Sequence, residues 1–120
     1  MITTKTLLPT TVYGTPSGNY DGSSQDWVGV AAEAANYYRG RGGLQTVLIN
    51  VTNLVGEIIV EATLDTVAET ATWFETYTYG DSSSAVTDFH SVNIPGNFAW
   101  LRARVVGFDS GTINSVTVSY

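Results

Sequence analysis

The sequence predicts an all-β fold: a single antiparallel β-sandwich, jelly-roll-like, with about eight short strands and an N-terminal arm. Apolar and polar residues alternate along most of the chain, which is the period of strands with one face on a core. Turn-forming residues, mainly Gly, Pro, Asn and Asp, recur between these runs. With 120 residues and no break in composition, residues 1–120 have the size of one domain.

The first part of the chain has the weakest strand pattern. Residues 2–13 are rich in Thr and Val but are interrupted by Pro9, which suits an edge strand or an arm better than a central strand. The Gly- and Ser-rich residues that follow form a loop, so residues 1–24 are expected to be an extended arm and loop. Residues 27–38 fit a short helix or a strand, and we favour a strand or an irregular segment.

The clearest alternation lies in residues 45–64, which we interpret as a hairpin. Residues 45–51 and 57–64 form its strands, and residues 52–56 form its turn. The predicted core face contains Val47, Ile49, Val51, Ile58, Val60, Ala62 and Leu64. Glu61 is expected on the opposite, solvent-facing side. The hairpin therefore predicts that Val60→Asp unfolds the domain and that Glu61→Gln leaves folding nearly unchanged.

Further strands are expected at residues 71–79, 86–94, 98–106 and 112–120, with turns at 80–84, 95–97 and 107–111. In the third of these strands, apolar side chains alternate with Arg102 and Arg104. Across the sheet these arginines are expected to pair with Glu57, Glu61 or Asp88.

The composition argues against several classes of binding partner. The net charge is −6 and the share of charged residues is only 13%. Binding to nucleic acid or to an anionic membrane needs clustered cations, so neither is expected. There is no cysteine, which excludes disulfides and thiolate chemistry. No apolar run approaches the length of a transmembrane helix and no secretory signal is recognisable, so we expect a soluble chain.

Three groups of polar residues could carry chemistry, but each has a commoner structural interpretation. His90 with Asp88 could act as a general base, although both fit a solvent-facing strand. Glu57, Glu61 and Glu75 could cleave glycosides, although alternating Glu is typical of an exposed face. The loop from Asp21 to Asp26 resembles a loose calcium site, but an ordinary turn is favoured. We therefore expect no enzymatic activity, no cofactor and no metal.

Aromatic residues and one arginine-containing loop are the better candidates for contacts with a partner or a glycan. Trp73, Tyr77 and Tyr79 have the same parity along the chain, which predicts that they share a face. Exposed aromatic side chains are typical of sugar-binding platforms and of protein interfaces. The full set of candidate contact residues is Tyr37, Tyr38, Arg39, Arg41, Trp73, Tyr77, Tyr79 and Trp100.

Residues 37–120 resemble small β-sandwich virion proteins of tailed bacteriophages. The resemblance is carried by G-x-I-x-V-x-A-T-L at residues 56–64, Trp73-Phe74, G-N-F-x-W-x-R-A at 96–103, and G-T-I-x-x-V at 111–116. It implies a non-enzymatic structural protein, a head decoration, neck or tail component, that attaches to the capsid or tail and stabilises or decorates the particle.

On this interpretation the partners are other virion proteins and further copies of the chain, in a trimer or a ring. The location is the virion, assembled in the host cytoplasm. The alternative is a carbohydrate-binding β-sandwich module, of a tail fibre or of a bacterial protein, that uses its exposed aromatics.

Overall fold

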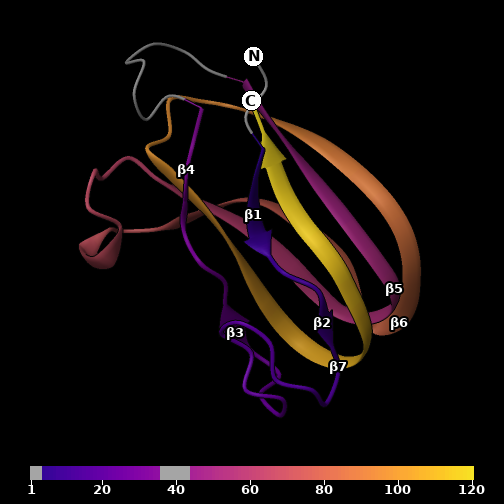
Figure 1. The fold of residues 1–120 in the computed structure, drawn as a ribbon. Helices are drawn as coiled ribbons and strands as arrows, with labels where there is room; N and C mark the ends of the chain where they lie inside the picture. Colours follow the sequence, from indigo (N-terminus) through magenta and orange to yellow (C-terminus); the bar gives the residue numbers. More distant parts are fainter. Residues whose placement is uncertain (1–3, 36–43) are drawn as a thin grey trace.

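The computed structural model describes residues 4–35 and 44–120 of the chain. They form one antiparallel sheet of seven strands in the order β1-β7-β5-β6, and β2, β3 and β4 also pair with β7 (Figure 1). The strands are β1 (Thr4–Leu8), β2 (Thr11–Val12), β3 (Trp27–Val28), β4 (Ala32–Glu33), β5 (Leu44–Thr63), β6 (Phe74–Pro95) and β7 (Trp100–Ser119). One 3₁₀ turn, η1 (Ala68–Thr70), lies between β5 and β6. The all-β, antiparallel prediction is confirmed.

The predicted hairpin at residues 45–64 is wrong, because β5 is one strand of 20 residues. Residues 52–56 bend the strand instead of reversing it, and the pairing of β5 with β6 and with β7 shifts register there. The predicted turns at 80–84 and 107–111 likewise lie inside the continuous strands β6 and β7. Glycines and bulges can bend a strand as well as end it, and here all three strands bend together so that their ladders continue. The predicted turn at 95–97 does separate two strands.

The bends fold the sheet over its own core (Figure 1). β1 and β2 pair with the C-terminal half of β7, whereas β3 and β4 pair with its N-terminal half. The two halves meet where Lys5 Nζ on β1 lies 2.7 Å from Glu33 Oε1 on β4. The Tyr120 hydroxyl adds a hydrogen bond of 2.9 Å to the Glu33 carbonyl. The described residues thus build one folded sheet and not two separate ones.

The core lies between the two halves of the folded sheet. The predicted alternation is confirmed in β5, where Val47, Ile49, Ile58 and Val60 have no exposed surface, but Leu64 lies beyond the strand and is 65% exposed. Among the other fully or almost fully buried side chains are Leu7, Leu8, Tyr20, Leu54, Leu101, Val105, Phe108, Ile113, Val116 and Val118.

The N-terminal residues that the structure describes are edge strands and not a projecting arm. Of the strands that the structure describes, β1 pairs with β7 only, and its Leu7 and Leu8 are 1% exposed. Burying two leucines stabilises the fold by about 3–6 kcal/mol, which holds this segment on the core. The following loop contributes Tyr20, which is buried against Trp27 and Phe108. Composition predicts a loop here but does not indicate that one of its side chains is buried.

Candidate functional site

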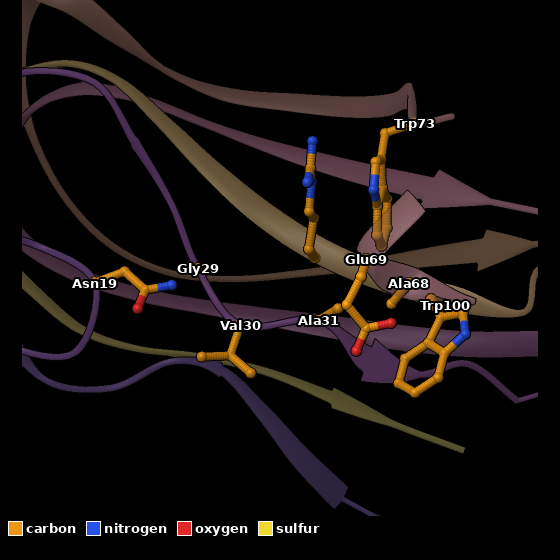
Figure 2. A pocket seen from close by; sticks show the side chains of 9 residues that line it. Asn19, Gly29, Val30, Ala31, Ala68, Glu69, Trp73 and Trp100 are labelled. Carbon is orange, nitrogen blue, oxygen red and sulfur yellow. The ribbon is translucent and has the colours of Figure 1, made fainter. Parts of the chain in front are cut away.

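An open groove of about 370 Å³ lies beside the N-terminal half of β7. Figure 2 shows Asn19 and Val30 toward one side of it, and Glu69 and Trp100 toward the other. The groove is lined by Asn19, Gly29, Val30, Ala31, Ala68, Glu69, Trp73, Trp100 and Arg102. Of the sequence-predicted contact residues, the structure brings together Trp73 and Trp100 at this groove.

The groove floor is held by a network of charges on the outer face of β5 and β7. Arg102 donates from Nε to Glu61 Oε1 at 2.7 Å, and its Cζ lies 4.2 Å from the centre of the Trp73 ring. Glu61 also accepts from Arg104 Nε at 3.1 Å, and Arg104 reaches Glu75 at 3.3 Å. The predicted pairing of these arginines with Glu61 is confirmed.

The expectation that Glu61 faces solvent is wrong, because this residue is only 6% exposed. Two arginines from β7 and the Trp73 side chain, which precedes β6, close over this part of the sheet. The sequence showed alternation in β5, but alternation cannot reveal that the second face is covered as well.

The connection between β5 and β6 forms one wall of the groove and is held by specific hydrogen bonds. Asp65 accepts from the Thr72 backbone N–H at 2.8 Å, which closes the loop. Trp100 donates from its indole Nε1 to the Thr66 carbonyl at 3.0 Å. These contacts place Ala68 and Glu69 beside Trp100. Nothing in the sequence pattern indicates that Glu69 or Asn19 lies at this site, because neither belongs to a motif.

Tyr77 and Tyr79 do not share a face with Trp73, contrary to the parity prediction. Tyr77 pairs with Val60 and Glu75 pairs with Glu61, so β6 holds one extra residue between the two pairs. This bulge reverses the alternation, because every residue beyond it points to the other face. Tyr77 and Tyr79 therefore turn toward the core side of the sheet, where Tyr79 is 8% exposed.

His90 and Asp88 share a face, as predicted, and their side chains remain 35% and 45% exposed, but both also contact tyrosines. The Tyr77 hydroxyl and His90 Nε2 are 2.8 Å apart, and the Tyr79 hydroxyl donates to Asp88 Oδ2 at 2.9 Å. The His90 and Tyr79 rings stack with centroids 5.1 Å apart. Burial, together with the hydrogen bond to Asp88, raises the pKa of Tyr79 to about 12. The four side chains join the two halves of β6.

The other polar candidates are engaged within the fold. Asp21 accepts from the backbone N–H groups of Ser23 at 2.8 Å and Ser24 at 2.7 Å, and these bonds lower its pKa to about 2. Asp26 accepts from the Gly107 N–H at 2.9 Å. The Asp21 contacts fit the predicted turn, whereas the Asp26 contact ties the loop to β7. Within residues 4–35 and 44–120, no group of three or more His, Cys, Asp or Glu could hold a metal ion.

A second surface of interest is the outer edge of β6. This strand has 22 residues and, among the strands of the described residues, pairs with β5 alone, so every second residue directs its N–H and C=O away from the sheet. Two of the N–H groups of this strand are taken by local carboxylates: Ser83 donates to Asp81 and Phe89 donates to Asp88, both at 2.8 Å. Phe89 itself is 65% exposed.

Tyr37, Tyr38, Arg39 and Arg41, which the sequence also nominated as contacts, lie outside the described residues. In the part of the chain that is described, no helix has the length and hydropathy needed to cross a membrane. Comparisons of the chain with protein-family models, with curated proteins and with solved structures gave no match.

Proposed function

We propose that this protein is a non-enzymatic structural component of a tailed-bacteriophage virion, which attaches to the capsid or tail and stabilises or decorates the particle. The sequence resemblance supplies the virion setting. The structural observation that supports an assembly role is the long edge of β6, which pairs on one side only within residues 4–35 and 44–120. In this proposal the two halves of the folded sheet act as the two layers of the expected sandwich, and the edge is where a neighbour adds.

The β6 edge suits strand addition because it lacks lysine and internal proline, and only two of its N–H groups are known to be held by its own carboxylates, Asp81 and Asp88. Proteins commonly protect edges with lysine, proline or inward-pointing charge. β6 contains no Lys or Arg, and its only proline is its last residue, Pro95. The exposed Phe89 supplies apolar contact next to the backbone groups. A second copy or another virion protein that added here would gain main-chain hydrogen bonds. If a second copy adds through a different surface of its own, repetition of this head-to-tail contact would produce the proposed trimer or ring.

Oligomerisation is tested with Ser91→Pro. Because the Phe89 N–H binds the Asp88 side chain and not β5, the alternation of an antiparallel ladder directs the Ser91 N–H outward as well. Proline removes that donor and leaves the β5–β6 ladder intact, whereas the control Ser91→Thr keeps it. Analytical ultracentrifugation should show an oligomer for the parent chain and for Ser91→Thr, and dissociation for Ser91→Pro. A parent chain that stays monomeric at high concentration contradicts assembly through β6.

The virion assignment has its own test. Virus particles purified from the source of this sequence are subjected to peptide mass spectrometry and to immuno-electron microscopy with an antibody to the chain. We expect the protein in many copies at a fixed position on the capsid, neck or tail. Its absence from purified particles contradicts the assignment, whatever the oligomeric state of the isolated protein.

A further inference from the structure

We propose that the groove beside β7 is a binding site for a neutral saccharide. This goes beyond the structural role and does not depend on it, because the groove and the β6 edge are formed by different residues. Its volume of about 370 Å³ falls within the roughly 300–1,000 Å³ of small-molecule sites.

The lining of the groove combines flat apolar surface with hydrogen-bonding groups. Trp73 and Trp100 contribute indole rings, with Arg102 over one face of the Trp73 ring. Glu69 and Arg102 contribute a carboxylate and a guanidinium, and Asn19 contributes an amide whose Nδ2 also donates to the Val28 carbonyl at 2.9 Å. A sugar ring presents C–H groups on its faces and hydroxyls around its edge. The C–H faces suit aromatic side chains. Vicinal hydroxyls suit planar groups that can form two hydrogen bonds at once.

The groove is also fixed before any ligand arrives. Arg102 is held by Glu61 at 2.7 Å and by its contact with Trp73, and only its Nε is used in the ion pair. Its terminal nitrogens thus remain as donors at the groove, with no partner among the described residues. Trp100 is held by its hydrogen bond to Thr66. Side chains that are already ordered lose little conformational entropy on binding, which favours a weakly binding ligand such as a sugar.

The charges select a neutral ligand. Near the groove floor, Arg102 and Arg104 are matched by Glu61 and Glu75, and Glu69 adds a further carboxylate at the wall. The site therefore has no net positive charge to attract an anionic sugar. The five charges sum to −1, so a cation is opposed only beside Trp73, where the guanidinium of Arg102 already lies over the ring. Neutral hydroxyl groups can hydrogen-bond to both the donors and the acceptors of the groove without charge repulsion.

The direct test titrates the full chain with methyl glycosides of glucose, galactose, mannose and N-acetylglucosamine, and follows tryptophan fluorescence and amide chemical shifts. We expect saturable binding of at least one glycoside with a dissociation constant on the order of 1 mM. The shifts should be confined to the groove lining. Absence of saturable binding by all four overturns the proposal, and so does tighter binding of glucuronate than of glucose.

A matched pair of variants locates the site. Glu69→Ala removes the exposed carboxylate at the groove wall and should weaken the best glycoside about tenfold or more. Asp109→Ala makes the same change of charge at the exposed bend of β7, outside the groove lining, and should leave the affinity unchanged. Equal affinities for Glu69→Ala and the parent chain overturn the placement. Thermal unfolding of both variants shows whether the fold is retained, and Ser91→Pro should bind the sugar as the parent does.

Discussion

The guanidinium carbon of Arg102 lies 4.2 Å from the centre of the Trp73 ring, while its Nε donates to Glu61 at 2.7 Å. A cation above an indole is attracted by the ring quadrupole, and a planar guanidinium can stack and form an ion pair together. One side chain on β7 therefore joins β5 to the segment that precedes β6. The fold and the groove floor share this contact.

Arg102→Lys is expected to destabilise the protein by about 1–2 kcal/mol, because an ammonium reproduces neither the stacking nor the planar hydrogen-bond geometry. Urea unfolding followed by circular dichroism measures the loss. Arg104→Lys is the comparison, since Arg104 also donates to Glu61 but lies over no aromatic ring among the described residues. Arg104→Lys should reduce the free energy of unfolding by less than Arg102→Lys does. An equal or larger loss for Arg104→Lys would show that the Trp73 contact contributes nothing to stability.

Glu61→Gln is expected to destabilise by about 1–3 kcal/mol, which reverses the expectation from the sequence. Glu61 is 6% exposed and accepts from two arginines. The neutral amide leaves both without their shared counter-charge, although their partial exposure limits the cost. The same replacement at Glu57, which pairs with no cation among the described residues, should change stability by less than about 0.5 kcal/mol. Equal urea midpoints for the two variants would contradict this view of Glu61.

The contrast between Val60 and Glu61 shows how far the sequence could be interpreted. Alternation in β5 placed Val60 correctly in the core, because period two follows directly from strand geometry. The outer face of β5 is covered by side chains from other parts of the chain, and alternation within one strand does not reveal this. The burial of Glu61 could therefore not be predicted from the sequence. The same holds for Trp73 and Tyr77: the bulge that separates their faces depends on pairing with β5 and leaves no mark in the hydrophobic pattern.

The bends were the other limit of sequence interpretation. Gly56 and Gly111 lie in segments whose composition is typical of turns, and both have a positive φ. A glycine of this kind suits a bend within a strand as well as a turn between two strands. The structure shows a bend, because the pairing of β5 with β6 and with β7 continues beyond these residues. Only some of the residues that line the groove could be predicted from the sequence. Its two tryptophans stood out by composition, whereas Asn19 and Glu69 reach it through loops whose positions are set by packing.

Gly111→Ala is expected to destabilise by at least about 3 kcal/mol. Gly111 has φ +96°, and a Cβ built there would lie 2.1 Å from the Asn53 carbonyl oxygen, at the point where β5 and β7 bend together. Gly14 is the control, because it has φ +87° but nothing within 4 Å of an added Cβ. Gly14→Ala should cost only about 1 kcal/mol, the strain of the positive φ. Equal thermal midpoints for the two variants would mean that the bend opens without penalty.

Val60→Asp is expected to abolish folding. Val60 has no exposed surface and lies in the central strand, so an aspartate there would be either a buried unpaired charge or a neutral acid without partners. Val12→Asp introduces the same charge at a side chain that is 46% exposed on the edge strand β2 and should fold. Circular dichroism and amide chemical-shift dispersion distinguish the two. A dispersed spectrum for Val60→Asp would show that the folded sheet is open at its centre.

Tyr79 predicts a specific loss of stability in alkali. Burial and the hydrogen bond to Asp88 raise its pKa from 10.0 to about 12 in the folded protein. Since the folded pKa lies above the unfolded one, this contribution is fully present below pH 10 and is lost as the pH rises toward 12. The difference in unfolding free energy between the parent chain and Tyr79→Phe should therefore favour the parent at pH 8 and shrink above pH 10.

The measurement is urea unfolding at several pH values, with tyrosinate absorbance recorded in parallel. Other tyrosines also ionise in this range, so the comparison with Tyr79→Phe isolates one residue among the seven. Asp88→Asn keeps an acceptor for the Tyr79 hydroxyl but removes the carboxylate charge that opposes ionisation. It should retain the part of the pH dependence that comes from burial, which is the largest cause of the raised pKa. A free-energy difference between the parent and Tyr79→Phe that is the same at pH 8 and pH 11 would place the Tyr79 hydroxyl in water, away from Asp88.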